Sequence, residues 1–130
     1  MNGSCVDKRI NSFRDLKVYA KAFNAAMEIY HMSKKFPPEE RYSLTDQMRR
    51  SSRAVCANLS EAWRKRKYKA VFINKITDCS QEAAETQTWL QFACECGYIS
   101  KEYFKELDER YEHIYAMLLS MERKAEGFCK

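Results

Sequence analysis

Residues that interrupt regular structure are scarce in this 130-residue sequence, which has three glycines, two prolines and two histidines. Because sheets and irregular loops need turn residues, this scarcity favours long, uninterrupted helices. No stretch approaches the roughly 20 consecutive apolar residues that a membrane-spanning helix needs. The first ten residues are polar and lack the apolar segment of a secretory signal, so we expect a cytoplasmic protein.

The six cysteines form no recognisable metal-binding or redox motif. No two of them have the Cys-x-x-Cys spacing, and the two histidines, His31 and His113, are isolated in the sequence. Nothing indicates secretion, so we expect reduced thiols that act as small, partly buried hydrophobic residues. The sequence therefore predicts no bound metal and no cofactor.

Motifs of the common catalytic sites are also missing. The sequence has no glycine-rich phosphate loop, no His-Glu-x-x-His motif and no local pairing of cysteine with histidine. Glu82 and Glu85 lie three residues apart, but a carboxylate-bridged metal site would also need a histidine on the same helix. We expect a non-enzymatic protein, and we assign no catalytic residue.

The sequence does contain apolar residues that recur every three to four positions in four segments. This period is typical of amphipathic helices. Ser12 with Asp15, and Ser43 with Asp46, have the spacing of capping boxes that begin the first two helices. Gly97 suits the position after the third helix, where a left-handed residue closes the last turn. The four expected helices span residues 13–36, 43–66, 70–96 and 101–126.

These segments predict an all-α fold. Short connections between helices of matched length place neighbouring helices antiparallel, which gives an up-down-up-down four-helix bundle. We expect the bundle over residues 13–126, between a flexible segment at 1–12 and a tail at 127–130. The stripe expected to face the core on the first helix is Leu16, Tyr19, Ala20, Phe23, Ala26, Met27 and Tyr30.

Several apolar residues lie off these core stripes. The first helix has a second stripe that includes Val18, Ala22, Ala25 and Ile29, and a single bundle does not readily bury two sides of one helix. One broad core would accommodate both stripes, but the surplus favours self-association. The residues expected at an oligomer interface are Val18, Ala22, Ile29, Trp63, Trp89 and Phe92.

Positive charge is concentrated in the second helix and the turn after it. Residues 37–69 carry nine Lys and Arg against four Asp and Glu, a net charge of +5, whereas residues 70–99 carry one Lys against four acids, a net charge of −3. The helix dipole favours cations in the last turn of a helix, but it does not explain those further upstream. The candidate nucleic-acid-binding residues are Arg49, Arg50, Arg53, Arg64, Lys65, Arg66, Lys67 and Lys69.

A row of cations binds phosphate oxygens and releases condensed counterions when it meets a nucleic-acid backbone. Between Arg49 and Lys69 the only acidic residue is Glu61, although a merely solvated face normally mixes charges of both signs. Aromatic residues near this stretch are candidates for stacking on bases, with Phe72 expected in the core. They are Tyr42, Trp63, Tyr68 and Phe72. The pattern predicts backbone binding with little base preference.

Four short segments carry a family pattern: residues 13–19 (FRDLKVY), 36–37 (FP), 42–52 (YSLTDQMRRSS) and 58–62 (NLSEA). They resemble a bacterial family, the "four helix bundle proteins", also called 23S rRNA intervening-sequence proteins. The chain departs from the family pattern at Ala62, where glycine is usual, and at residues 56–57, where proline-serine is common. The matching polar residues are Gln47, Arg49, Arg50, Asn58 and Glu61.

The resemblance implies a four-helix bundle that assembles as a ring-shaped homopentamer. It also implies a relation to the accessory proteins of diversity-generating retroelements, which are basic pentameric barrels that bind nucleic acid and partner a reverse transcriptase. Both the rRNA-insertion type and the retroelement accessory type fit the sequence. The alternative function is an adaptor that docks a partner enzyme without contacting nucleic acid.

Overall fold

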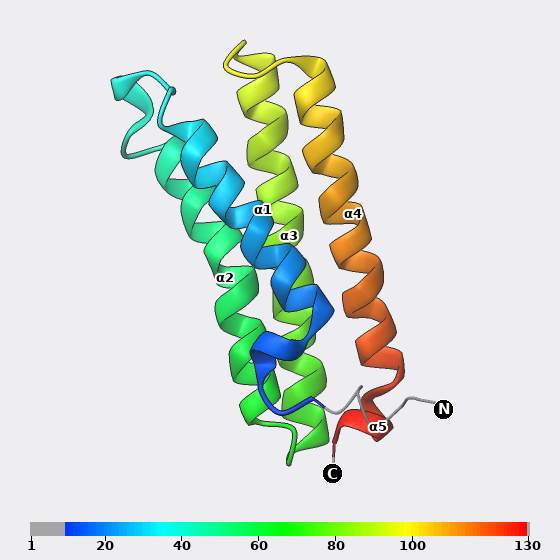
Figure 1. The fold of residues 1–130 in the computed structure, drawn as a ribbon. Coiled ribbons are helices and arrows are strands. Elements are labelled where there is room, and N and C mark those ends of the chain that lie inside the picture. The colour runs from blue at the N-terminus through cyan, green and yellow to red at the C-terminus, as the bar shows by residue number, and fades with distance from the viewer. Residues whose placement is uncertain (1–9, 130) are drawn as a thin grey trace.

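The computed structural model describes residues 10–129, and this part of the chain is all-helical, with four long helices, one short helix and no strand. The long helices pack side by side, and the chain reverses its direction between one long helix and the next (Figure 1). The long helices are α1 (Lys17–Ser33), α2 (Leu44–Arg64), α3 (Lys69–Glu95) and α4 (Lys101–Arg123), and the short one is α5 (Ala125–Phe128).

The start of α1 differs from the expectation. Ser12 and Asp15 do form a capping box, but the box caps a short 3-10 turn, η2 (Phe13–Asp15). Leu16 then adopts an extended conformation (φ −69°, ψ 129°), which interrupts the helical path before Lys17. Its side chain is only 4% exposed, so this break turns Leu16 into the core. The helix expected over residues 13–36 is therefore a turn followed by a 17-residue helix.

The capping box expected at Ser43 and Asp46 is wrong. The Ser43 hydroxyl donates to Glu40 Oε1 at 2.7 Å instead of accepting from the helix. Glu40 belongs to the 3-10 turn η3 (Pro38–Glu40), and the same carboxylate oxygen accepts the Leu44 N–H at 3.3 Å. The Glu40 carboxylate, and not the Ser43 side chain, thus caps α2, because its Oε1 accepts the first N–H group of the helix.

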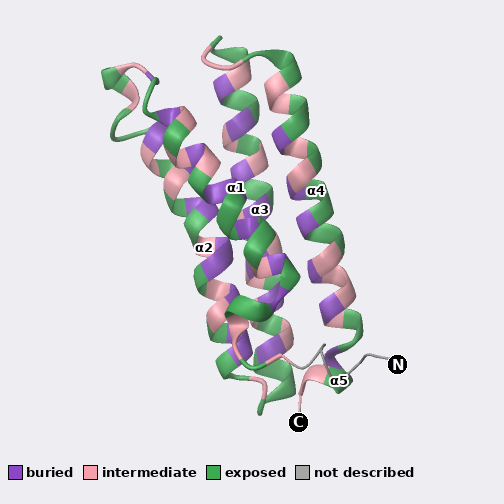
Figure 2. Cartoon of the chain, viewed as in Figure 1, coloured by how far each residue is buried: buried purple, intermediate pink, exposed green. Residues whose placement is uncertain are grey.

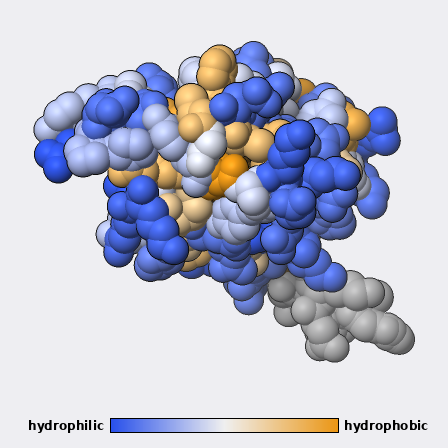
Figure 3. All heavy atoms as spheres, turned by 90° about the horizontal axis from the view of Figure 1, so that it is seen from above, coloured by the Kyte–Doolittle hydropathy of each residue, from blue (hydrophilic) through white to orange (hydrophobic). Residues whose placement is uncertain are grey.

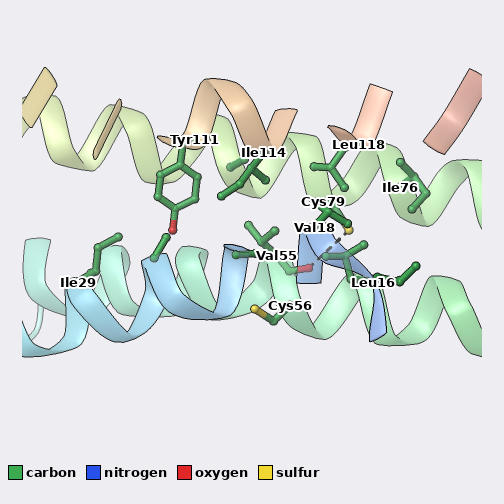
Figure 4. Close-up of a cluster of buried hydrophobic side chains, with 14 of the residues drawn as sticks. Leu16, Val18, Ile29, Val55, Cys56, Ile76, Cys79, Tyr111, Ile114 and Leu118 are labelled. Atoms are coloured by element: carbon green, nitrogen blue, oxygen red, sulfur yellow. Dashed lines mark hydrogen bonds between the residues drawn. The ribbon is translucent and has the colours of Figure 1, made fainter. Parts of the chain in front are cut away.

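Helices α2, α3 and α4 bury the faces that their periodicity predicts. The stripe that the helical period predicts for α2 is fully buried, and it consists of Leu44, Met48, Ser51, Val55, Leu59 and Ala62. Ser51 on this stripe shares a 2.8 Å hydrogen bond with Thr86 of α3. Gly97 has a φ of 81°, as expected for the residue that closes α3. Buried residues line the facing sides of the helices (Figure 2). Tyr111 of α4 points into the core among residues such as Ile29 and Val55 (Figure 4).

The buried side of α1 follows its second stripe, and in the stripe expected to face the core only Leu16 and Ala26 are buried. Val18, Ala22, Ala25 and Ile29 are at most 3% exposed and belong to the core of the protomer itself. In the stripe expected to face the core, Phe23 is 47% exposed and Met27 is 40% exposed. Two small alanines in the buried stripe let α1 lie close to its neighbours, whereas aromatic rings would hold it away. Apolar surface is still in surplus, but it lies on the other side of α1.

The packed part of the chain extends past residue 126. Phe128 of α5 stacks on Phe72 of α3, with ring centroids 6.0 Å apart, and meets the edge of Trp63 of α2 at 6.4 Å. Trp63 is 8% exposed as a result. The expected tail at 127–130 is therefore partly a helix that covers this end of the core, and residues 1–9 and 130 lie outside the described part.

At the opposite end, the connection between α1 and α2 lies beside the turn between α3 and α4 (Figure 1). Seen from this end, hydrophobic residues gather in the middle of the molecule and hydrophilic residues surround them (Figure 3). Tyr98 of the α3–α4 turn donates its hydroxyl to Glu40 Oε2 at 2.8 Å. The carboxylate that caps α2 thus also joins the α1–α2 connection to the α3–α4 turn.

Candidate nucleic-acid interface

The eight candidate cations form two groups along α2 and the turn that follows it. Arg49, Arg50 and Arg53 lie in the first half of α2, and the other five lie between Arg64, its last residue, and Lys69, the first residue of α3. Arg53 and Arg64 are eleven residues apart on one helix, which corresponds to about 16 Å. The positive charge therefore extends along a helix instead of collecting at one point.

Arg49 does not belong to the solvent-facing row. Its Nε donates to the Ser33 hydroxyl at 2.8 Å, and a second guanidinium nitrogen donates to the Tyr30 carbonyl at 3.3 Å. The guanidinium also lies 4.9 Å from the centre of the Tyr30 ring. Because the last carbonyls of a helix have no partner within it, Arg49 completes the C-terminal turn of α1 and joins it to α2.

Two cations of the second group are also engaged within the protein. Arg66 donates to the Trp63 carbonyl at 2.8 Å, and its guanidinium stacks 3.6 Å from the centre of the Trp63 ring. Lys69 forms an ion pair with Glu126 of α5. Both contacts fasten the end of α2 and the start of α3 to their surroundings, so these two side chains are the least available to a ligand.

Five candidate cations remain exposed to solvent. Arg50 is the only one of them in an ion pair with a described carboxylate, and its Nε is 3.9 Å from Asp46, with the Arg50 side chain 74% exposed. A long, exposed pair of this kind contributes little binding energy and breaks easily. The five exposed cations, which we call the basic row, are Arg50, Arg53, Arg64, Lys65 and Lys67.

The groove between α2 and α3 carries charges of both signs. It has a volume of about 470 Å³, and Gln47, Arg50 and Arg53 line it from α2. Glu82 and Glu85 line it from α3. Burial, the Glu85 charge and the Asp78 charge together raise the pKa of Glu82 above its usual value. Because these carboxylates would repel phosphate, the groove itself is a poor site for a nucleic-acid backbone.

The polar residues that match the family pattern on the α3 side of α2 serve the protein's own structure. Asn58 donates its amide to the Ala54 carbonyl at 3.0 Å within α2. Glu61 forms an ion pair with Lys75 of α3 at 2.7 Å. The one acidic residue in the basic segment is therefore turned towards α3 and partly neutralised there.

The aromatic residues near the basic row divide by burial. Trp63 is 8% exposed and Phe72 is fully buried, so neither is available for stacking on a base. Tyr42 is 86% exposed and Tyr68 is 58% exposed. Tyr68 lies in the α2–α3 turn, with the Lys67 ammonium 5.9 Å from its ring centre.

Four of the six residues expected at an oligomer interface are unavailable for one. The core of the protomer is broad and buries four of them, Val18, Ala22, Ile29 and Trp63. Phe92 of α3 remains 54% exposed, and the half-buried Trp89 packs against it with ring centroids 6.2 Å apart. Only this pair, Trp89 and Phe92, offers apolar surface from the original set.

The described cysteines and acids do not gather into a metal-binding group of three or more His, Cys, Asp and Glu. Cys56 and Cys79 are buried in the core, and burial raises the pKa of the Cys56 thiol to about 11 and that of Cys79 further. Both are therefore inert thiols at neutral pH, and Cys5 lies outside the described residues.

None of the described helices has the length and apolar content needed to cross a membrane.

Residues 14–120 match the family described as 23S rRNA-intervening sequence protein. The chain belongs to this family. A crystal structure of a protein of unknown function from the S23 ribosomal protein family of Bacteroides thetaiotaomicron is similar, with 28% sequence identity and a TM-score of 0.73. The similarity covers 82% of this chain and 95% of that one. A search of curated proteins finds no match.

Proposed function

We propose that this member of the 23S rRNA-intervening sequence protein family is a non-enzymatic, homo-oligomeric scaffold that binds RNA through the basic row. The observation that carries the proposal is the row itself, five exposed cations over one helix and its turn, four of which form no ion pair with a described residue. The family's description refers to rRNA, which supports RNA as the ligand. DNA presents the same phosphates and is the secondary candidate.

The chemistry of the row predicts contacts with phosphates. Arginine guanidinium groups bind phosphate oxygens with two parallel hydrogen bonds, and lysines act as point charges. Side chains spread along about 16 Å of helix follow a backbone, whereas reading a base requires a side chain positioned at a base edge in a groove. We therefore expect binding that depends strongly on salt and only weakly on sequence.

Assembly is the second part of the proposal. Phe92 of α3, with the half-buried Trp89 packed against it, leaves apolar surface exposed on the protomer. Large exposed apolar residues on a small protein commonly mark contacts between subunits. We propose an up-down-up-down four-helix bundle that assembles as a ring, with five protomers as the family resemblance implies. Repetition of the basic row around a ring would add weak sites together through avidity.

A charge-reversal variant tests the RNA-binding part directly. Arg50→Glu, Arg53→Glu and Arg64→Glu together should abolish binding of a labelled RNA at low salt while leaving helicity intact. The matched control reverses three exposed cations of α4, Lys101, Lys105 and Arg123, and thus changes the net charge by the same amount. Equal loss in both variants would indicate an effect of net charge alone, and unchanged binding in the first would contradict the proposal.

A second function is favoured by the groove between α2 and α3. Arg50 and Arg53 on one side and Glu82 and Glu85 on the other suit a protein surface with both signs of charge. The chain would then be an adaptor that docks a partner enzyme, such as a reverse transcriptase, without contacting nucleic acid. Copurification of one specific protein that survives nuclease and high salt would favour the adaptor, whereas steep salt dependence would favour RNA.

A further inference from the structure

A row of exposed aromatic and apolar side chains runs along α1 beside α2. The rings of Tyr19 and Phe23 are stacked, with centroids 6.1 Å apart and an angle of 22° between their planes. Phe13 meets the edge of Tyr19 at 5.1 Å and extends the row towards the N-terminus. Phe23 is 47% exposed and Met27 is 40% exposed, so the middle of the row faces solvent.

The row ends at Tyr30 of α1, and cations lie at both of its ends. At one end, the Arg53 guanidinium of α2 lies 5.8 Å and the Lys34 ammonium 4.6 Å from the centre of the Tyr30 ring. At the other end, the Arg64 guanidinium of α2 lies 5.9 Å from the centre of the Phe13 ring. Two members of the basic row thus border the aromatic row from the neighbouring helix.

The carboxylates of α1 and of the C-terminal half of α2 are held by partners on other helices. Glu28, the only acidic residue of α1, binds Arg110 and the Tyr103 hydroxyl of α4. Burial acts to raise the pKa of Glu28, but these hydrogen bonds outweigh it and lower the pKa, so the group stays charged and paired. Glu61 of α2 is held by Lys75 of α3. The surface between α1 and α2 is therefore aromatic and cationic, unlike the mixed groove between α2 and α3.

We propose that this α1–α2 surface is a binding platform for single-stranded RNA. Bases stack on Phe23 and Tyr19, while their phosphates contact Arg53 and Arg64. The inference rests on the proposed RNA-binding function and adds the class of RNA. Single-strand binding surfaces combine a positively charged path with aromatic side chains on which unpaired bases stack. A duplex cannot use the rings, because its bases are already stacked on one another inside the helix.

The distribution of charge favours RNA over a second protein on this surface. The centre of a protein–protein interface is depleted of charged residues, which lie at its rim. Here Arg53 and Lys34 lie beside the Tyr30 ring and Arg64 lies beside the Phe13 ring, so cations border the exposed rings at both ends of the row. An occupant that supplies both flat apolar groups and regularly spaced negative charges satisfies the two features together, and a single-stranded nucleic acid does so.

The test uses fluorescence anisotropy with a labelled oligouridylate of about 12 nucleotides, within the range of single-strand sites, and a blunt RNA duplex of equal length. Phe23→Leu keeps an apolar side chain but removes the stacking ring, and it should weaken oligouridylate binding by about five- to a hundredfold. Phe23→Trp should restore it. Tyr115→Leu is the matched control, because Tyr115 is 42% exposed on α4, a helix that does not lie directly beside α2.

Several outcomes separate this proposal from the function on which it rests. Loss of binding in the triple charge reversal but not in Phe23→Leu would leave the RNA-binding function in place and overturn the platform. Equal affinity for the duplex and the single strand would also overturn it. A fall in the light-scattering mass of Phe23→Leu would show that the surface joins two copies of the chain. Failure of the wild-type protein to bind any RNA would remove both proposals.

Discussion

The Arg49 guanidinium joins two helices, although it lies in the most basic segment of the chain. Its contacts with the Ser33 hydroxyl and the Tyr30 carbonyl span 16 and 19 residues of sequence. Arg50, the next residue, extends into solvent with a loose ion pair to Asp46. Successive residues of a helix point about 100° apart, so two adjacent arginines can have entirely different roles.

Arg49→Ala should therefore lower the free energy of unfolding, by about 1.5–3 kcal/mol, because it removes the hydrogen bonds of a charged group to the Ser33 hydroxyl and the Tyr30 carbonyl. Arg50→Ala should change stability by less than about 0.5 kcal/mol, as expected for an exposed substitution, but weaken RNA binding. Urea unfolding followed by circular dichroism measures the first effect, and anisotropy the second. Equal stability of the two variants would contradict the structural role given to Arg49.

At the scale of single elements, the success of sequence-based prediction depended on how many apolar stripes a helix carries. Helix α2 has one dominant stripe, so its periodicity fixed its buried face, and all six expected residues are buried. Helix α1 has two stripes, and its own sequence does not say which neighbours it meets. Small residues such as Ala22 and Ala25 turned out to lie in the core, because they allow close packing, and the larger Phe23 lies outside.

The start of α2 is a second case in which an element depends on its surroundings. The Glu40 carboxylate accepts hydrogen bonds from the Ser43 hydroxyl, the Tyr98 hydroxyl and the Leu44 N–H, and these lower its pKa below the ordinary value of 4.5. The same hydrogen bond to Glu40 raises the pKa of Tyr98 to about 12. The partner Tyr98 is 58 residues away in sequence, so local spacing alone does not predict that it helps to position the Glu40 carboxylate.

This arrangement predicts how stability depends on pH. A carboxylate with a lowered pKa in the folded state contributes stability above its unfolded pKa and loses it as the pH falls through the folded value. Glu40→Gln should thus have a lower melting temperature than the wild type at neutral pH, and the difference should shrink below about pH 4. Glu39→Gln, at the exposed neighbouring position, is the control and should follow the wild type throughout. A Glu40→Gln difference that does not change with pH would contradict the assignment.

At the scale of the whole molecule, the all-helical bundle and the family could be predicted from the sequence, because the first depends on local periodicity and the second on short motifs. The candidate site could be predicted only in part. Composition identified the segment of residues 37–69 but could not separate the five exposed cations from Arg49, Arg66 and Lys69, whose partners lie on other elements. The short α5 could not be predicted, because four residues are too few to show a helical period. In the structure its Phe128 covers Trp63.

One measurement, the mass of the particle in solution, tests both the proposed assembly and the proposed ligand. Light scattering at low salt should give a mass close to five times the 15.4 kDa of one protomer, and this mass should rise when a short single-stranded RNA is added. The triple charge reversal should keep the first mass and lose the increase. A particle of 15.4 kDa whose mass does not change with RNA would contradict both the scaffold and its ligand.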